Sequence, residues 1–423
     1  MTLDFARLLP PPKLALLRRV ASLSAQLRLP AYLVGGFARD LLLKRPVNDL
    51  DIVVEGDAIQ LARALAKAEG GRTLAHFKFG TAVWTLPDGS TLDFITARSE
   101  TYSQPGALPT VKFSSIADDL RRRDFTINAM AVRLDGDPLG ALIDPLEGQA
   151  DLQRGLIRVL HPHSFVDDPT RILRAARYAV RYGFKLEDET LKLVNEEACQ
   201  ALAGLSGERL RHELDLSFAE QYSSVILARL REMKALTFVR PALNSLTEPL
   251  PPLMEPPRAW GNIPIPDMLT MRQCLGWLTW LAPLPKAELV ALAERLAFPA
   301  ALTRSALAAS ALLIDLPALA ESKPSQWTFH LDALPALAMY AVYLRTQRPA
   351  LKEYLANWRH IHARTTGDDL KALGLPPGPR YAEILQTLRA AWLDGEVGNE
   401  EEEKKLTRKC AAPDLMGRGL SRR

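Results

Sequence analysis

The stretch Tyr32-Leu-Val-Gly-Gly-Phe-Ala-Arg-Asp40, followed nine residues later by Asp49-Leu-Asp51, decides the fold of the first part of this chain. An apolar run ends at two glycines and a helical pattern follows, which predicts a strand, a tight turn and a helix. Such a turn lets backbone N–H groups approach a phosphate, and the N-terminus of the following helix favours negative charge. Because most Gly-Gly turns are only structural, a phosphate site here needs support from other residues.

Two carboxylates follow this turn at the start of a strand predicted over residues 51–54. Residues two apart on a strand share one face, so Asp49 and Asp51 aim at one point. Two like charges so close are costly unless a cation lies between them, and Mg²⁺ takes carboxylate oxygens together with phosphates. If a second strand, predicted over residues 91–96, is a neighbour of the first, Asp93 completes a three-carboxylate site for two-metal phosphoryl transfer. Otherwise the three aspartates are ordinary solvent-facing residues.

The pattern of elements predicts an α+β fold in the first part of the chain and an all-helical remainder. Residues 1–30 are expected to form a leading amphipathic helix, and the turn Pro87-Asp-Gly-Ser90 indicates a hairpin between two strands. The charged run at residues 400–405 is expected to be a solvated helix face. The expected strands cover residues 51–54, 82–86 and 91–96, and the expected helices cover residues 58–69, 170–182, 190–203, 208–220, 289–296 and 381–393.

The composition is that of an ordinary globular protein, with 48% apolar and 24% charged residues among 423 and a net charge of +4. It excludes a disordered chain, a collagen and a disulfide scaffold. The three cysteines, Cys199, Cys274 and Cys410, lie far apart, which excludes a structural zinc site and fits reduced thiols. No apolar run approaches the ~20 residues of a membrane span, and the N-terminus lacks the apolar core of a signal peptide. We therefore expect a soluble, cytoplasmic protein without a membrane partner.

Five ordered motifs carry a resemblance to a known family. They are Gly35-Gly-Phe-Ala-Arg-Asp40 with Asp49-Leu-Asp51, Arg122-Arg-Asp-Phe-Thr-Ile-Asn-Ala-Met-Ala131, Ile143-Asp-Pro-Leu-Glu-Gly148, Asp167-Asp-Pro-Thr-Arg-Ile-Leu-Arg-Ala-Ala-Arg177 and Gly207-Glu-Arg-Leu-Arg-His-Glu-Leu214. Together they resemble the bacterial class II tRNA nucleotidyltransferase and poly(A) polymerase family. The resemblance covers residues 35–214, whereas residues 215–365 carry no such motif.

The resemblance implies a division of the chain into segments. A polymerase-β-like nucleotidyltransferase head with a mixed sheet is followed by an all-α neck, body and tail. Residues 241–266 contain eight prolines and are read as a connector, because proline at that density stops helices. The expected boundaries are 1–140 for the catalytic head, 141–240 for the neck and RNA-binding body, 241–266 for the connector, 267–410 for a tRNA-binding tail and 411–423 for a frayed end.

The resemblance also implies roles for individual head residues. Residues matching Asp49 and Asp51 hold the catalytic Mg²⁺ in the family, and Asp93 matches a third carboxylate whose role is less uniform. Residues matching Gly36 and Arg39 contact the triphosphate. Arg123 matches an arginine that contacts the nucleotide.

A stripe of arginines follows Asp168, which matches the base-reading part of the family motif. Arg171, Arg174 and Arg177, with Arg181, follow at spacings of three, three and four residues and so lie near one helical face. The stripe repels itself unless an anion binds to it, so Arg174 and Arg177 are expected to contact phosphates or position the base. A contact with an acidic helix is the alternative.

Asp168 and Arg171 can read a nucleotide base. The carboxylate accepts hydrogen bonds and the guanidinium donates them, which matches the amino group and ring nitrogen of cytosine or adenine. Uracil and guanine present the reverse order and would leave buried groups unpaired, at about 1–3 kcal/mol per group. This agrees with a family in which protein residues, without a template strand, select CTP and ATP.

The sequence therefore predicts template-independent addition of CCA to the 3′ end of tRNA from CTP and ATP, with release of pyrophosphate. A-adding or CC-adding enzymes and poly(A) polymerases share these motifs and stay open as alternatives, as does a non-catalytic RNA-binding relative. A loop at residues 99–109 argues against CC addition alone, because CC-adding members lack it. The strings at residues 97–102 and 164–171 resemble a branch with divided labour, which keeps A addition open. The oligomeric state is left undecided.

Overall fold

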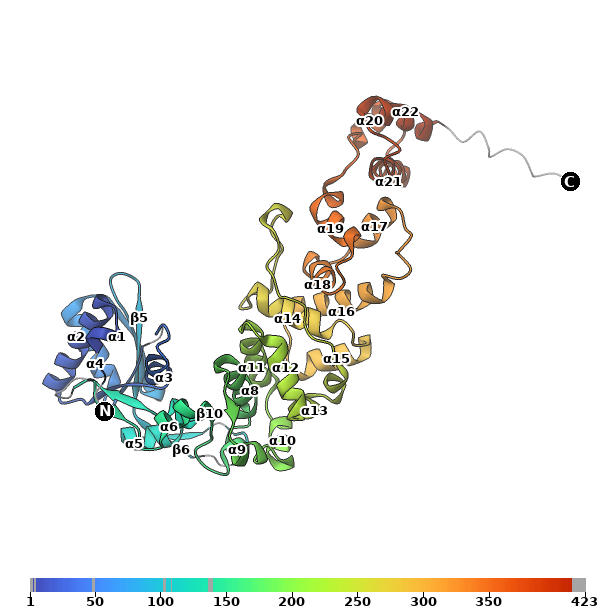
Figure 1. The fold of residues 1–423 in the computed structure, drawn as a ribbon. Coiled ribbons are helices and arrows are strands. Elements are labelled where there is room, and N and C mark those ends of the chain that lie inside the picture. Colours follow the sequence, from blue (N-terminus) through green and yellow to red (C-terminus); the bar gives the residue numbers. More distant parts are fainter. Residues whose placement is uncertain are drawn as a thin grey trace. The chain divides into compact units, whose positions relative to one another are not determined.

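The computed structural model describes residues 3, 5–47, 50–101, 104–107, 109–135 and 140–412 (Figure 1). The chain divides into two compact units, unit 1 at residues 1–244 and unit 2 at residues 245–423. The boundary falls within the proline-rich segment at residues 241–266. Unit 1 holds a mixed sheet and helices and unit 2 is helical, so the predicted α+β fold is confirmed.

A seven-stranded sheet forms the head of unit 1, in the order β3-β4-β5-β2-β1-β8-β9. Strands β2 and β5 are parallel and all other neighbours are antiparallel. The strands are β1 (Ala31–Val34), β2 (Asp51–Val54), β3 (Arg72–His76), β4 (Thr81–Thr85), β5 (Thr91–Thr96), β8 (Ala131–Arg133) and β9 (Leu142–Ile143), with separate pairs β6 (Arg98–Thr101) with β7 (Thr110–Phe113) and β10 (Leu156–Ile157) with β11 (Lys185–Leu186).

One face of the head sheet carries the main core. Helix α4 packs on β3, β4 and β5, and Ile52, Trp84 and Phe94 are fully buried beneath the helices. The alternation of buried and exposed residues along β5 shows that its other face is open, because successive side chains on a strand point to opposite faces. The helices of the head are α1 (Phe5–Leu8), α2 (Pro11–Leu27), α3 (Gly36–Leu42), α4 (Ala58–Glu69) and α5 (Ile116–Arg121), with short 3₁₀ turns η1 (Phe77–Phe79) and η2 (Thr126–Asn128).

Helices follow the head within unit 1. The predicted helix at residues 190–203 is wrong in one respect, because it is two helices. Asn195 begins the second one by accepting a hydrogen bond from the Ala198 N–H at 3.0 Å, and an asparagine cap of this kind starts a new helix. The helices are α6 (Gly148–Arg154), α7 (Ser164–Asp167), α8 (Thr170–Tyr182), α9 (Asp188–Lys192), α10 (Glu196–Ala203), α11 (Gly207–Ala219), α12 (Ser223–Glu232) and α13 (Ala235–Val239), before the 3₁₀ turn η3 (Pro241–Ser245).

Unit 2 is a succession of helices in which α14, α16 and α18 pack together and α17 packs against α19 and α21 (Figure 1). The expectation of a fully solvated face at residues 400–405 is wrong for Glu403, which is 1% exposed. No helix in the described part of the chain is long and apolar enough to cross a membrane. The helices are α14 (Met271–Leu281), α15 (Lys286–Arg295), α16 (Ala300–Asp315), α17 (Pro324–Leu331), α18 (Ala336–Thr346), α19 (Pro349–Ala356), α20 (Gly367–Ala372), α21 (Pro379–Leu393) and α22 (Glu400–Ala411), with 3₁₀ turns η4 (Arg258–Trp260) and η5 (Trp358–His360).

Candidate active site

The turn between β1 and α3 requires glycine at its first position. Gly35 has φ of 61°, in the left-handed region, and a Cβ there would lie 2.8 Å from Nη1 of Arg123. Gly36 then begins α3. The turn therefore brings backbone N–H groups and the Arg123 guanidinium to one spot, as an anion site requires.

The two described carboxylates of the predicted metal site lie on neighbouring strands. Asp51 and Asp93 are register partners in the parallel pair of β2 and β5, so their side chains point to the same face of the sheet. Asp49 lies outside the described residues. Among the residues that the structure describes, no group of three or more His, Cys, Asp or Glu residues could hold a metal ion. Two adjacent carboxylates on one face are nevertheless a donor set that suits Mg²⁺.

A cavity of about 590 Å³ opens beside these strands, within the usual size of small-ligand sites. Four positions of α8, namely Arg171, Arg174, Tyr178 and Arg181, line it, so it runs along that helix for about 15 Å. Asp93 and Arg177 are not among its lining residues. The predicted site residues that do line it are Gly36, Arg39, Asp51, Arg123, Asp168, Arg171 and Arg174.

A fully buried carboxylate orients two arginines toward this cavity. Asp119 accepts hydrogen bonds from Nε and Nη2 of Arg122 at 2.9 and 2.6 Å and from Nη2 of Arg123 at 2.9 Å. Sequence reasoning missed Asp119. Its position three and four residues before the two arginines on a helical turn was the available signal.

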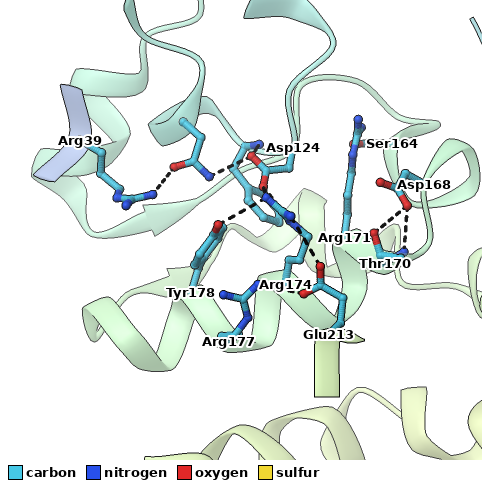
Figure 2. A network of polar contacts seen from close by, with 12 residues as sticks. Arg39, Asp124, Ser164, Asp168, Thr170, Arg171, Arg174, Arg177, Tyr178 and Glu213 are labelled. Carbon is cyan, nitrogen blue, oxygen red and sulfur yellow. Dashed lines mark hydrogen bonds and ion pairs between the residues drawn. The ribbon is translucent and has the colours of Figure 1, made fainter. Parts of the chain in front are cut away.

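A chain of polar contacts links the head to α8 (Figure 2). Arg39 donates to both carboxylate oxygens of Asp40 at 2.9 Å and to Oδ1 of Asn128 at 2.5 Å. Asn128 in turn donates to Oδ1 of Asp124 at 2.9 Å. Oδ2 of Asp124 accepts from Nε and Nη2 of Arg174 at 3.0 and 2.5 Å. The motif around Asp124 thus reaches the neck helix through its own side chains.

Asp124 is held ionised by this chain. Burial alone would raise the pKa of the Asp124 carboxyl, but the guanidinium of Arg174 and the hydrogen bond from Asn128 outweigh burial and lower it. The Arg174 guanidinium is held charged in the same way, since Asp124 and Glu213 raise its pKa against the effect of burial.

The arginine stripe is neutralised by acidic residues of a second helix as well as by Asp124. Glu213 on α11 lies 3.6 Å from Nη1 of Arg174 and accepts from Nη2 of Arg177 at 2.8 Å (Figure 2). Arg181 is paired with Glu220 at 3.4 Å. The alternative of a contact with an acidic helix is therefore realised, most fully at Arg177, which lies away from the cavity. Glu213 within the motif at residues 207–214 was the signal for this partner.

Asp168 and Arg171, the predicted base-reading pair, use only some of their polar atoms in hydrogen bonds within the protein. Arg171 donates from Nη1 to the Ser164 hydroxyl at 2.6 Å and from Nη2 to the Arg122 carbonyl at 2.8 Å. All hydrogen bonds to Asp168, from the Thr170 N–H and hydroxyl and from Arg209, go to Oδ1. Within the described residues, Oδ2 of Asp168 and three N–H groups of Arg171 stay available to a ligand, which is one acceptor beside a set of donors.

The site thus combines a glycine turn with a cation above it, two adjacent carboxylates, and an acceptor–donor pair along one cavity wall. This set suits transfer of a nucleotide, with a phosphate end and a base end. The family model described as "Poly A polymerase head domain" matches residues 31–158, and that described as "Probable RNA and SrmB- binding site of polymerase A" matches residues 183–247.

Relatives that match nearly the whole of this chain support the same assignment. The A-adding tRNA nucleotidyltransferase of Halalkalibacterium halodurans is 33% identical over 416 residues, which cover 93% of this chain and 92% of that protein. This chain belongs to the class II tRNA nucleotidyltransferase and poly(A) polymerase family. The A-adding tRNA nucleotidyltransferase of Geobacter sulfurreducens is 36% identical over 96% of this chain, although the match spans about half (48%) of that relative.

Solved structures of family members share the whole fold. The apo form II of a CCA-adding enzyme has a TM-score of 0.80 and 29% identity, covering 96% of this chain and 97% of that chain. The Thermotoga maritima CCA-adding enzyme complexed with tRNA has a TM-score of 0.74 and 27% identity, again covering 96% and 97%. The order of a mixed-sheet head followed by a largely helical region is therefore that of these structures.

Proposed function

We propose that this protein adds the terminal A to tRNA molecules that end in CC, using ATP and releasing pyrophosphate. The observation that carries this proposal is the match over 93% or more of the chain to two A-adding enzymes. The sequence alone favoured addition of the whole CCA end. That activity becomes the second candidate, supported by the TM-score of 0.80 to a CCA-adding enzyme.

The proposed reaction uses the two ends of the cavity. Asp51 and Asp93, with Asp49, would hold Mg²⁺, which supplies activation of the 3′-hydroxyl and neutralisation of phosphate charge when bound. The turn at Gly35 and the guanidinium of Arg123 receive the triphosphate. The tRNA 3′-hydroxyl then attacks the α-phosphate in line, and the bond to pyrophosphate breaks.

The other end of the cavity selects the base. Oδ2 of Asp168 accepts the amino proton of adenine and Arg171 donates to the adjacent ring nitrogen. Arg174 is held between Asp124 and Glu213 along the same wall of the cavity. A fixed wall of this kind discriminates bases without a template.

The test is nucleotide incorporation into tRNAs that end before CCA, after C and after CC, each with ATP, CTP or both. We expect one A on the CC end and no reaction with CTP, with Asp51→Asn as the inactive control. Addition of two C and one A to the shortest tRNA would instead establish the second candidate. No incorporation by the wild-type protein on any of the three would contradict both.

A further inference from the structure

Four large apolar side chains of the head are exposed at one edge of the sheet. Leu74 on β3 is 63% exposed, Phe77 and Phe79 in η1 are 67% and 52% exposed, and Phe113 on β7 is 64% exposed. We name these four residues the aromatic edge. Exposed apolar groups of this size in one region indicate a binding surface rather than scattered surface residues.

Contacts within the head hold these rings together. A Cβ at Gly80, the residue after η1, would lie 2.7 Å from the Phe113 ring, so the ring lies directly against that backbone. The Gly80 carbonyl also accepts from the Thr96 N–H at 2.9 Å, which ties η1 to β5. Phe113 on β7 therefore lies beside the residue that directly follows Phe77 and Phe79 of η1.

Basic side chains accompany the rings. The Arg63 guanidinium stands 5.1 Å from the centre of the Phe77 ring, and the Lys78 ammonium stands 5.7 Å from that of Phe79. Arg72 and Lys112 are also exposed on the adjoining strands. Aromatic rings interleaved with cations are the combination by which proteins bind single-stranded nucleic acid, because bases stack and phosphates pair.

Strand register connects Leu74, the member of the aromatic edge on β3, to the predicted catalytic carboxylates. Leu74 is opposite Val83, Val83 is opposite Asp93, and Asp93 is opposite Asp51, so these four side chains lie in one row on one face. Three strand spacings make this row about 14 Å long. That length corresponds to about four stacked nucleotides at 3.4 Å each.

The cavity meets this row at Asp51. Its lining includes Ile95 on β5 and Arg98 and Glu100 on β6, besides residues of β1, α3, β2 and the segment at residues 122–128, whereas none of its lining residues belongs to β3, η1 or β4. An RNA end that lies on the open face of β5, β4 and β3 would reach Asp51 along this row.

We infer that the aromatic edge binds the single-stranded 3′ end of the RNA substrate, with its bases stacked on Phe77, Phe79 and Phe113. The inference rests on the proposed function and adds the surface that receives the primer strand. The cations at Arg63 and Lys78 pair with the phosphates of the same strand.

The test compares substitutions that keep or remove a flat ring. Phe77→Leu and Phe79→Leu keep an apolar side chain but lose the stacking face, whereas Phe77→Tyr and Phe79→Tyr keep it. For tRNA ending in CC, we expect each Leu variant to raise the RNA KM and Kd about fivefold to thirtyfold, with ATP KM and kcat at saturating RNA unchanged. The Tyr variants should stay within about twofold of wild type. Leu8→Ala, at an exposed apolar residue on α1 (39% exposed), is the control for loss of apolar surface.

Three outcomes overturn the inference. Unchanged RNA affinity in both Leu variants, with active wild-type protein, removes the primer role and leaves the proposed function intact. A rise in the KM for ATP alone would assign the edge to the nucleotide. A wild-type dimer that the Leu variants convert to a monomer, measured by sedimentation, would assign the edge to a second copy of the chain.

Discussion

Asp124 in unit 1 and Glu403 in unit 2 are both buried carboxylates, 7% and 1% exposed, but their partners differ in kind. Asp124 pairs with the guanidinium of Arg174, a side chain that also lines the cavity. Glu403 accepts from the backbone N–H groups of Arg364 and Thr365 at 3.1 and 2.6 Å and from the Trp392 indole at 2.5 Å. One carboxylate orients a cation beside a cavity, and the other joins a loop to a helix.

This difference separates functional from structural burial of charge. Backbone and indole N–H groups carry no net charge and cannot turn toward a ligand, so the hydrogen bonds of Glu403 join α22 to the backbone at residues 364 and 365 and to the Trp392 ring. An arginine between Asp124 and Glu213 keeps further N–H groups for an incoming phosphate or base. The partner of a buried carboxylate, more than its burial, therefore indicates whether it serves a site.

The largest expected effect tests the cavity itself. Asp51→Asn removes a negative charge beside Asp93 but keeps the shape, so nucleotide transfer should fall about a thousandfold or more because the metal site is lost. Single-turnover rates with saturating tRNA measure this. The melting temperature and tRNA affinity should match wild type, and near-normal turnover would show that Asp51 is not a metal ligand.

The next prediction compares the effects of replacing the two buried carboxylates, Asp124 and Glu403, on stability and on catalysis. Asp124→Asn should destabilise unit 1 by roughly 2–4 kcal/mol, less than a fully buried pair, because the Arg174 side chain is 32% exposed. It should also slow transfer. Glu403→Gln should cost unit 2 about 1–3 kcal/mol through one unmet donor, with kcat unchanged at saturating tRNA. Urea unfolding and steady-state kinetics measure both, and equal kinetic losses would contradict the comparison.

The same pair predicts a pH dependence with a definite sign. The pKa of Asp124 is lowered in the folded protein, because Arg174 and Asn128 outweigh burial. Its contribution to stability is therefore present above the pKa of the unfolded chain and is lost as pH falls through the folded pKa. In Asp124→Asn this acid-side slope in the free energy of unfolding should be reduced. If the slope between pH 5 and pH 2 is unchanged in this variant, the acid-side dependence of the free energy of unfolding arises from other carboxylates.

Local elements of the fold could be predicted from the sequence because they depend on near neighbours. The helices at residues 58–69 and 170–182 and the strand at residues 91–96 are observed with those bounds, since periodicity and turn residues act over a few positions. The turn at Gly35 is likewise a local requirement of backbone conformation.

The partners within the site could not be predicted, since they are far apart in the chain. Asp124 and Arg174 are 50 residues apart and Arg177 and Glu213 are 36 apart, so only the tertiary fold brings them together. The charge pattern indicates that the arginine stripe has a negatively charged partner, but it does not show whether a ligand or another part of the chain supplies that charge. Burial of Glu403 could not be predicted either. Its helix neighbours are equally acidic, and its partners Thr365 and Trp392 lie elsewhere in the chain.

A smaller effect tests base selection at the far end of the cavity. In Asp168→Asn the side-chain oxygen can still accept from the Thr170 N–H, while the group facing the ligand becomes a donor. The ratio of kcat/KM for ATP over GTP should then fall about 5- to 100-fold, because adenine and the amide present donors to each other. Asp167→Asn, whose side chain faces His161 and not the cavity, is the matched control. An equal loss with both nucleotides would limit the role of Asp168 to its contacts with Thr170 and Arg209.

The smallest expected effect concerns unit 2, where basic side chains are exposed to solvent and do not line the cavity described for unit 1. Arg348 directly before α19, Lys352 on α19 and Lys371 on α20 are exposed, and no catalytic motif lies in these segments, so we predict that they contact tRNA phosphates. Changing each to Ala should weaken tRNA binding a few-fold and lower the slope of log affinity against log salt by about 1, with ATP KM unchanged. Lys352→Arg keeps the charge and should bind as wild type. If the salt slope of all three Ala variants equals that of the wild type, these three side chains do not touch phosphate, and the exposed cations of unit 2 would then differ from the arginines beside the cavity of unit 1.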